Sequence, residues 1–320
     1  MRRLRRTLQL RQLLTEHEWN FKDLIIPLFV VEGNAIKETI PSMPGIFRYS
    51  LDNLLRELEH PLYRQAGGIL LFGVPEYKDS QATMAWSENG IVQKACREIK
   101  SNYPELILIT DLCMCSYTDH GHCGVIDKEG RIDNDQSLEI LSKIALAQAN
   151  AGTDVIAPSD MMDGRVAVIR ESLDKSGLSD RLILSYAAKF ASAFYGPFRE
   201  AADSAPQCGD RKSYQLPPAN RREALREMAE DVAEGADILM VKPGLAYLDI
   251  LREARDKFDL PLAAYNVSGE YAMIKAAAAN GWIDEINAVN ETILSFKRAG
   301  ADLIITYHGH DLYQWFKGER

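Results

Sequence analysis

Eight short, mostly apolar runs, spaced along nearly the whole chain, constrain its fold more than any other feature of the sequence. Each run is five to seven residues long, and most are rich in Ile, Leu and Val. Such runs are typical of strands that are buried on both faces of a parallel sheet. The runs are residues 24–30, 68–74, 106–110, 154–158, 181–186, 237–241, 262–266 and 302–306.

Segments with the periodicity of amphipathic helices separate most of these runs. Gly152, Gly235 and Gly300 each follow such a segment and stand two residues before an aspartate that opens the next run. Glycine at a helix C-terminus is typical of the short loops that lead from a helix to a strand. Eight strand and helix units in one chain predict an α/β fold, a (β/α)8 TIM barrel. The helical segments are 137–151, 163–176, 221–234, 247–257, 271–280 and 291–299.

No linker or change of composition divides the barrel, so we expect one catalytic domain over residues 21–320. Residues 1–20 precede the first strand, are first basic and then polar, and carry several leucines. The barrel is complete without this arm. The arm is therefore either disordered or docks on another subunit of a homo-oligomer.

Composition limits the functional class. With a net charge of −9, the chain is not expected to bind nucleic acid or an anionic membrane. No apolar signal core follows the basic N-terminus, and no run is long enough to span a membrane, so the expected location is cytoplasmic. Three of the five cysteines lie within residues 113–123, which indicates a metal site in a reducing compartment rather than a disulfide framework.

Lys242 directly follows the apolar run 237–241 and precedes Pro243. It therefore lies at the carboxyl end of a buried strand, where α/β barrels place their catalytic residues. A lysine in an apolar pocket loses its charge readily and can attack a carbonyl to form a Schiff base. The alternative is a lysine whose side chain extends to solvent from the strand end.

Polar residues also follow the other strands. In a barrel these side chains converge on one mouth, which favours an active site over chance loop polarity. The residues are Asp111, Ser159, Lys189, Ser268 and Tyr307.

A second lysine, Lys189, is expected at the same mouth. Two neighbouring ammonium groups disfavour each other's charge, so at least one lysine should be neutral and nucleophilic near pH 7. Lys242 is predicted to be the more deeply buried and the first to react. Lys189, three residues beyond Tyr186, is predicted to be more exposed. Two lysines suggest two carbonyl substrates, whereas a class I aldolase needs only one.

The three clustered cysteines, Cys113, Cys115 and Cys123, fit a zinc site. Three thiolates leave a fourth tetrahedral position for water or substrate, as in catalytic zinc sites. Alternatively, His120 or His122 fills that position and closes a structural site. A zinc-stabilised binding protein would need such a closed site, and it would leave both lysines unexplained.

Residues 191–218 form a long connection that is expected to act as a lid. Arg199, Arg211 and Lys212 give it positive charge that suits a substrate carboxylate, although a solvated basic loop is the simpler interpretation. His308 and His310, near the C-terminus, are expected to be exposed and to have no ligand role.

Taken together, the motifs resemble one family, porphobilinogen synthase, also called 5-aminolevulinate dehydratase. The resemblance covers essentially the whole chain after about residue 24, in family order. The matching stretches are SMPG at 42–45, SYTDHGHCG at 116–124, KFASAFYGPFRE at 189–200, GDRKSYQ at 209–215, MVKPG at 240–244 and VSGEYAM at 267–273.

The resemblance implies the condensation of two 5-aminolevulinate molecules to porphobilinogen, with loss of two waters, in tetrapyrrole (heme) biosynthesis. It implies that Lys242 forms a Schiff base with the substrate that supplies the propionate side, and that Lys189 holds the second substrate. Asp111 would help with proton transfers. The resemblance assigns Ser268 and Tyr307 to the carboxylate of the first substrate. It assigns the carboxylate of the second substrate to Arg199 and Lys212, with Arg211 and Gln215. Ser159 is also expected among the substrate-binding residues.

The resemblance also implies cofactors and assembly. The cysteines match the zinc-dependent branch of the family, in which zinc polarises the second substrate or supplies a bound hydroxide. Glu227 matches a position that binds an activating magnesium in some members. Its alternative is an exposed helical carboxylate paired with nearby arginines. The family resemblance further implies a homo-octamer in which the arm wraps a neighbouring barrel.

Overall fold

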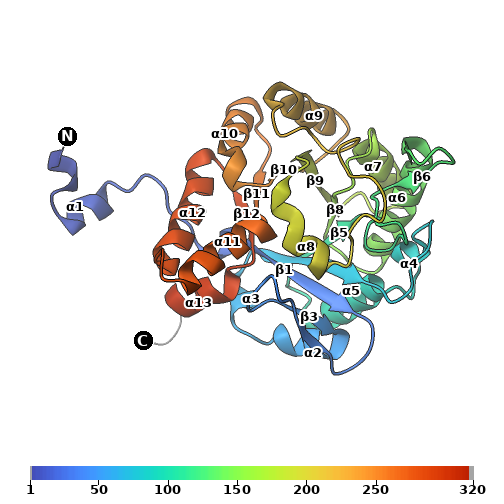
Figure 1. Ribbon diagram of the computed structural model, residues 1–320, viewed down its shortest axis with the longest axis horizontal. Coiled ribbons are helices and arrows are strands. Elements are labelled where there is room, and N and C mark those ends of the chain that lie inside the picture. Colours follow the sequence, from blue (N-terminus) through green and yellow to red (C-terminus); the bar gives the residue numbers. More distant parts are fainter. Residues whose placement is uncertain (1, 317–320) are drawn as a thin grey trace.

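The computed structural model describes residues 2–316, and it confirms the predicted barrel. Eight parallel strands form a ring that closes where the last strand pairs with the first (Figure 1). The strands are β1 (Leu24–Val31), β4 (Gly68–Val74), β5 (Leu108–Leu112), β8 (Val155–Pro158), β9 (Leu182–Lys189), β10 (Ile238–Lys242), β11 (Leu262–Asn266) and β12 (Leu303–Thr306).

A shell of helices surrounds the ring (Figure 1). The longer helices are α5 (Ile91–Asn102), α6 (Asn134–Asn150), α7 (Arg165–Lys175), α9 (Arg221–Ala233), α10 (Leu248–Lys257), α11 (Ser268–Ala279), α12 (Glu285–Ala299) and α13 (Gly309–Phe316). Shorter elements lie between them: α2 (Leu51–Glu57), α3 (Leu62–Gln65), α4 (Thr83–Trp86), α8 (Gly196–Ala201), 3₁₀ turns at Phe21–Asp23, Ala193–Tyr195 and Leu245–Tyr247, the pair β2 (Lys37–Thr39) and β3 (Phe47–Ser50) beside β1, and the hairpin β6 (Val125–Ile126) and β7 (Ile132–Asp133).

The strands alternate between two apolar cores. In β10, Ile238 and Met240 point into the barrel, whereas Leu239 and Val241 pack against the helices. Successive residues of a strand face opposite sides, so Lys242 continues the inward series. The apolar runs are therefore buried on both faces, as the sequence predicted.

The loops confirm the pattern of glycine followed by aspartate. Gly152, Gly235 and Gly300 all have positive φ, at 104°, 100° and 113°, a backbone conformation that favours glycine. The aspartates that follow them bind backbone N–H groups at the start of the preceding barrel strand. Leu108 donates to Asp154, Ile183 to Asp237 and Leu262 to Asp302, over 2.7–2.8 Å. Each loop thus ties neighbouring strands together.

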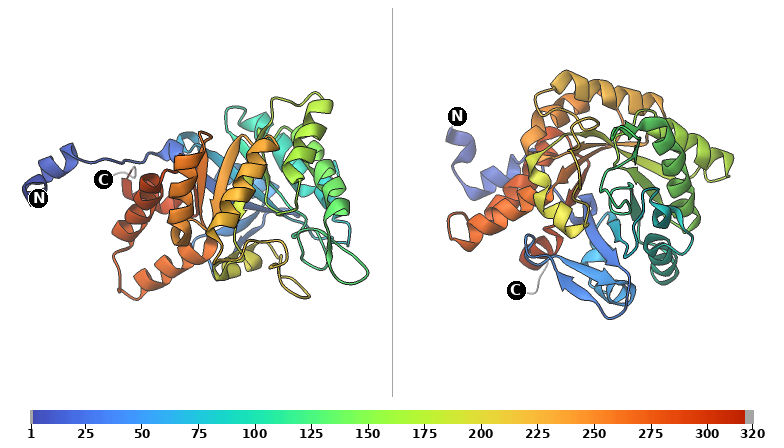
Figure 2. Two further views of the ribbon diagram at one scale, coloured as in Figure 1. Left: turned by 90° about the horizontal axis from the view of Figure 1, so that it is seen from above. Right: turned by 45° about the vertical axis from the view of Figure 1, so that its right-hand side comes forward.

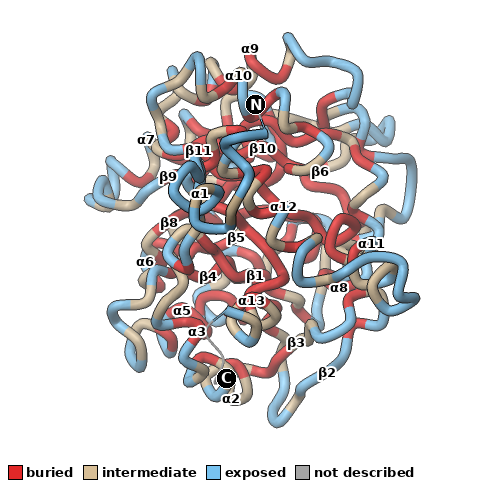
Figure 3. Tube along the Cα trace, turned by 90° about the vertical axis from the view of Figure 1, so that its left-hand side faces the viewer, coloured by how far each residue is buried: buried red, intermediate tan, exposed pale blue. Residues whose placement is uncertain are grey.

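The N-terminal arm lies apart from the barrel (Figure 2). A 3₁₀ turn (Arg2–Arg5) and α1 (Leu8–Leu13) have no buried residues (Figure 3). Leu13 is 78% exposed. The chain meets the barrel near Trp19, whose indole N–H donates to Asn290 over 2.8 Å. Docking of the arm on another subunit stays a prediction. None of the helices in residues 2–316 combines the length and apolar character that a membrane span requires.

A buried ion pair fastens α7 and α9 to β9. Arg165 lies 3.1 Å from Asp231, with both side chains at most 4% exposed, and it also donates to Ser185 Oγ. Replacing Asp231 with alanine would leave a buried arginine without its counter-charge. We expect Asp231→Ala to lower the free energy of unfolding by about 3–5 kcal/mol in equilibrium urea unfolding. Glu171→Gln, which breaks an exposed helical pair with Lys175, is the control and should leave it nearly unchanged; equal effects would contradict this interpretation.

Candidate active site

Two lysines lie side by side at the carboxyl ends of the neighbouring strands β9 and β10. Lys189 and Lys242 are register partners, and they are 5% and 4% exposed. The two lysines do not show the predicted difference in exposure, because β9 does not end at Tyr186. It extends to Lys189, so both lysines are buried strand ends.

A bulge in β9 explains why Lys189 points inward. The pairing between β9 and β10 shifts between Leu239 and Val241. Leu239 is the register partner of Ser185, whereas Val241 is the register partner of Ala188. One extra residue on β9 reverses the side to which all later side chains point. Without it, Lys189 would face the helices, five residues after the inward-facing Leu184. The bulge therefore places both amines in the barrel mouth.

Aromatic rings surround the amine of Lys242. Its nitrogen lies 4.2 Å from the ring centre of Tyr265 and 4.9 Å from those of Tyr186 and Phe198. Ring faces stabilise an ammonium, but burial and the charge of Lys189 dominate and lower the pKa of Lys242 to about 7. A substantial fraction of Lys242 is therefore a neutral nucleophile near pH 7.

These aromatic residues were not identified as site residues from the sequence. Tyr186 and Tyr265 lie at inward positions of their strands, which is the signal that could have found them. Phe198 lies on α8, which crosses the centre of the barrel mouth (Figure 1), and no strand pattern indicates its position.

Lys189 and Ser159 are in direct contact. The amine of Lys189 donates a hydrogen bond to the carbonyl oxygen of Ser159, which follows β8. This bond fixes the lysine side chain beside Lys242. The contact uses the backbone of Ser159 and shows why the predicted residue lies in the site.

Asp111 is a half-buried carboxyl group of the site. It lies inside β5, one residue before the end of the strand, whereas the sequence placed it just after a strand. Burial, reinforced by the negative charge of Cys115, raises the pKa of Asp111 to about 6, against the charges of Lys242 and Lys189. A carboxyl group with such a pKa can both donate and accept protons near neutrality.

The three cysteines form one cluster, as predicted. Cys113, Cys115 and Cys123 are at most 5% exposed, and their sulfur atoms lie within 4.8 Å of one another. Hydrogen bonds from the other two thiols hold the pKa of Cys115 well below its usual value. Three close, buried sulfur donors fit a soft cation such as zinc.

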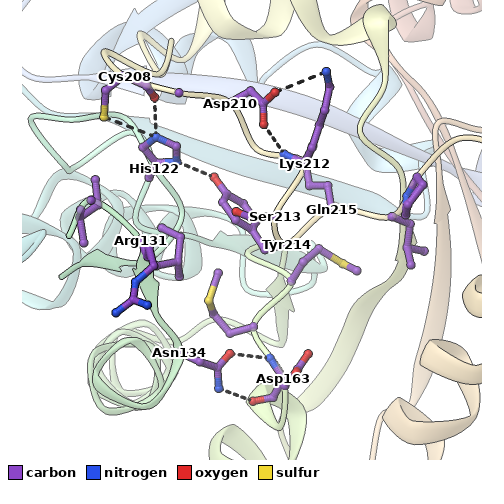
Figure 4. A pocket seen from close by; sticks show the side chains of 18 of the residues that line it. His122, Arg131, Asn134, Asp163, Cys208, Asp210, Lys212, Ser213, Tyr214 and Gln215 are labelled. Atoms are coloured by element: carbon purple, nitrogen blue, oxygen red, sulfur yellow. Dashed lines mark hydrogen bonds and ion pairs between the residues drawn. The ribbon is translucent and has the colours of Figure 1, made fainter.

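The neighbouring histidines do not complete this cluster. His122 uses both ring nitrogens elsewhere, 3.1 Å from the hydroxyl of Tyr214 and 2.8 Å from the carbonyl oxygen of Cys208 (Figure 4). Within residues 2–316, the metal-binding group at this place contains the three cysteines and neither His120 nor His122. This geometry favours an open fourth position over a closed structural site.

The lid arginines predicted to bind a carboxylate differ in burial and in their partners. Arg211 is buried and donates to the carbonyl oxygens of Gly121, over 2.9 Å, and Ser204, over 2.5 Å, so it holds the lid on the cysteine loop. Arg199 is half-buried on α8, and burial together with the charge of Arg211 lowers its pKa. The two arginines of the lid are therefore near enough for the charge of one to act on the other.

Lys212 and Gln215 line a cavity of about 810 Å³ between the lid and the β6–β7 hairpin (Figure 4). Lys212 is 77% exposed and pairs with Asp210 at 3.4 Å, whereas Gln215 is buried. Among the described residues that line this cavity, neither Lys189 nor Lys242 is present. The cavity is therefore separate from the two lysines, and Lys212 pairs with Asp210 instead of approaching them.

Ser268 and Tyr307 are both buried near Lys242. Ser268 begins α11, and its hydroxyl accepts the backbone N–H of Phe198 over 2.9 Å. The hydroxyl of Tyr307 is 3.0 Å from that of Tyr265, whose ring covers the lysine. The structure therefore brings together the two residues predicted to hold one carboxylate.

Glu227 lies away from the lysines, on α9 at the edge of the same lid cavity. It is half-buried, and in the described part of the chain it forms no ion pair with an arginine within 4 Å, which disfavours the exposed, arginine-paired alternative. Burial, followed by the charge of Asp163, raises the pKa of Glu227. Asp163 and Glu223 line the cavity with it, so this edge is acidic.

The prediction for the C-terminal histidines is wrong for His308. Its side chain is completely buried, its ring centre lies 4.4 Å from that of Tyr271, and its Nδ1 lies 3.1 Å from Asp311. His310 is 44% exposed and pairs with Glu57 at 2.7 Å. A polar sequence after the last strand suggested exposure, but Lys275, from a distant part of the chain, pairs with the Asp311 that bonds to His308.

Comparison with known proteins identifies the family. A family model described as delta-aminolevulinic acid dehydratase matches residues 1–315. The chain belongs to this family. It is 54% identical over 319 residues to the enzyme of that name from Halalkalibacterium halodurans, covering 100% of this chain and 97% of the relative. It is 55% identical over 314 residues to that from Bacillus subtilis, covering 98% of this chain and 97% of the relative.

A solved structure supports the same assignment. It is the delta-aminolevulinic acid dehydratase (porphobilinogen synthase) of Toxoplasma gondii in complex with the reaction product porphobilinogen. The two chains are 45% identical and superpose with a TM-score of 0.96, over 98% of this chain and 90% of the other. Family and fold, both predicted from the sequence, are thereby confirmed.

Proposed function

We propose that this chain is a hydro-lyase that condenses two molecules of 5-aminolevulinate to porphobilinogen, with loss of two waters, in tetrapyrrole (heme) biosynthesis. Family membership supports the reaction, and a relative is described with porphobilinogen as its product. The observation that carries the proposal is the pair of buried lysines, Lys189 and Lys242, held side by side in one mouth. Two amines can hold two carbonyl substrates at once.

The two lysines act as nucleophiles. The neutral amine of Lys242 adds to the ketone carbon of the first substrate, and loss of water leaves an imine. Lys189 captures the second substrate in the same way. A carbon–carbon bond then joins the substrates, the amino group of one substrate displaces one lysine, and elimination releases the other. The two waters lost in imine formation are the two waters of the overall reaction.

Asp111 is proposed to move protons in these steps. The charges of both lysines act on its carboxyl group, so it lies near both reacting centres. With a pKa of about 6, it can accept a proton that a substrate loses when a carbon–nitrogen or carbon–carbon bond forms. It can return that proton in a later step.

The substrate carboxylates are proposed to bind at two places. Ser268 and Tyr307 supply hydroxyl groups to the substrate on Lys242, and Arg199 supplies its guanidinium to the substrate on Lys189. Arg211 and Gln215 support this second place from the lid. Lys212 would have to leave Asp210 to reach it, which a lid closing over substrate permits.

Zinc is the proposed cofactor, held by Cys113, Cys115 and Cys123. When bound, it would polarise the second substrate or supply a bound hydroxide. Support comes from three buried sulfur atoms within 4.8 Å of one another and from the engagement of both His122 nitrogens elsewhere. Magnesium at Glu227 is a further proposal, supported by the acidic edge of the lid cavity, with an activating role away from the lysines.

We further propose a cytoplasmic homo-octamer in which the arm, residues 1–20, wraps a neighbouring barrel. The arm exposes Leu4, Leu8, Leu13 and Leu14, and α1 has no buried residue. Apolar side chains on a segment that leaves its own barrel favour docking on another subunit.

Incubation with 5-aminolevulinate, followed by a colour test for a pyrrole, tests the function. Pyrrole formation is expected. A single-lysine aldolase-type enzyme would form an adduct on one lysine without producing a pyrrole. That outcome would contradict the proposed function and favour the aldolase-type alternative.

The reactivity of Lys242 should depend on pH near neutrality. Its pKa is lowered to about 7, so the nucleophilic amine predominates above that pH and is lost as the pH falls below it. The initial rate of borohydride-trapped adduct formation with 4-oxopentanoate should reach half its maximum near pH 7. Lys189→Met removes a neighbouring positive charge and should move this midpoint to higher pH. A midpoint near the ordinary lysine value of 10.5 would contradict the argument.

A further inference from the structure

A partly buried polar cluster next to Tyr307 in the chain has no part in the chemistry described above. It consists of Lys275 on α11, Glu285 on α12, and His308 and Asp311 at the start of α13. The amine of Lys275 lies 2.6 Å from Glu285 and 2.7 Å from Asp311. Asp311 also lies 3.1 Å from His308 Nδ1. The cluster thus joins three helices.

The cluster already contains its own cation. The ligand atoms of Glu285, His308 and Asp311 lie within 4.8 Å of one another, which by itself would suit a metal ion. The ammonium of Lys275, however, bonds to both carboxylates. Burial opposes its charge, but hydrogen bonds to Asp311 and Glu285 raise its pKa. The lysine therefore neutralises the site, and a structural role fits better than a metal site.

The cluster connects two substrate-binding residues along the chain. Ser268 begins α11, the helix that carries Lys275 two turns later. Tyr307 immediately precedes His308, and Asp311 lies in the first turn of α13. The bond between Lys275 and Asp311 therefore ties the helix of Ser268 to the turn of Tyr307.

A separate series of hydrogen bonds also joins the turn of Tyr307 to the start of α11. The backbone N–H of His308 donates to Thr306 Oγ1 over 3.2 Å, and Thr306 donates to Asn266 over 3.0 Å. Asn266 in turn donates to Glu270 over 3.1 Å, within the first turn of α11. Two independent links thus fix the spacing between the segments.

Ring packing transmits the position of His308 to Tyr307. The ring of His308 packs at a tilt against Tyr271, with ring centres 4.4 Å apart, and Tyr271 meets Tyr307 edge to face at 5.9 Å. The hydroxyl of Tyr271 donates to the carbonyl oxygen of Pro44 over 2.5 Å, which holds this ring in place. A shift of His308 would therefore be felt at Tyr307.

We propose that Lys275, His308 and Asp311 are positioning residues that set the spacing between Ser268 and Tyr307, and thereby the affinity for the carboxylate of the substrate on Lys242. This inference rests on the proposed carboxylate-binding role of Ser268 and Tyr307. None of the three residues needs to touch the substrate, because each acts through the segment that it holds.

Lys275→Met tests the proposal, with Lys297→Met as a matched control. The two lysine side chains are 17% and 18% exposed, each lies on a helix, and each pairs with an aspartate: Lys275 with Asp311 and Lys297 with Asp23 at 3.1 Å. The probes are 4-oxopentanoate and its methyl ester, which share the ketone but differ in the charge of the carboxylate. Borohydride-trapped adduct on Lys242 is measured against probe concentration.

Lys275→Met should raise the half-saturating concentration of the acid about fivefold to tenfold and leave that of the ester unchanged, because one charged hydrogen-bonding site is weakened. At saturating 5-aminolevulinate, kcat should stay within about twofold, since uniform binding is what is lost. Arginine at the same position, Lys275→Arg, should retain the affinity for the acid, and Lys297→Met should leave the half-saturating concentration of both probes unchanged. If Lys275→Met does not fold, the milder change Asp311→Asn should also raise the half-saturating concentration of the acid.

Equal shifts for acid and ester, or the same shift in Lys297→Met, would overturn the positioning role while leaving the function intact. Failure of the proposed carboxylate site gives a different result. In that case Ser268→Ala and Tyr307→Phe would change the half-saturating concentrations of acid and ester by the same factor. This result would overturn both the carboxylate-binding role of these two residues and the inference that rests on it.

Discussion

Replacing Lys242 with methionine is expected to abolish porphobilinogen formation, lowering turnover by roughly 10⁴-fold or more, because no other group supplies the first imine. The fold should survive. The amine lies among Tyr265, Tyr186 and Phe198, so an apolar side chain of similar length suits the same space. Thermal unfolding should therefore show a midpoint equal to or above that of the unmodified enzyme.

Two further variants separate nucleophilicity from charge and position. Lys242→Arg keeps a positive charge but offers no neutral amine, so it should be as inactive as Lys242→Met. Lys189→Met should also lose turnover, yet it should retain an adduct on Lys242, because the first imine does not need the second lysine. Substantial pyrrole formation by Lys242→Met would contradict the assignment of this lysine.

Removal of zinc is expected to produce the second-largest effect. Metal-stripped protein should remain folded but lose turnover by roughly 100-fold or more, because the charge stabilisation supplied by a Lewis acid is worth several kcal/mol. Added zinc should restore activity. Elemental analysis alongside the pyrrole assay measures both quantities, and full activity in zinc-free protein would contradict the proposal.

The cysteines provide matched variants for this test. Cys115→Ala should lower zinc content and turnover together. Cys96→Ala alters another completely buried cysteine, whose sulfur lies 3.9 Å from Thr153 and outside the cluster, so it should retain both. Equal loss of zinc in the two variants would show that the metal is not held by the cluster.

The sequence was sufficient to predict the barrel because its strands are buried on both faces. Runs such as Ile238–Val241 leave no polar side that a different arrangement could expose to water. The loops were predictable in part, since Gly300 has a positive φ, a backbone conformation that favours glycine. Local patterns of this kind do not depend on distant parts of the chain.

Features that depend on tertiary contacts were not predictable in the same way. The inward orientation of Lys189 depends on a bulge opposite Leu239 and Val241, and no local residue signals this shift of register. His308 is buried because Lys275 and Asp311 neutralise its surroundings, and Lys275 is remote in sequence. The aromatic surroundings of Lys242 likewise combine side chains from two strands, β9 and β11, and from α8.

The central claim is that two neighbouring lysines each capture one substrate, with Lys242 reacting first. Borohydride reduction of the unmodified enzyme across a range of 5-aminolevulinate concentrations, followed by peptide mass analysis, tests it most directly. We predict an adduct on Lys242 at low substrate concentration and adducts on both Lys242 and Lys189 at saturation. Adducts confined to Lys189, or absent from both lysines, would contradict the account.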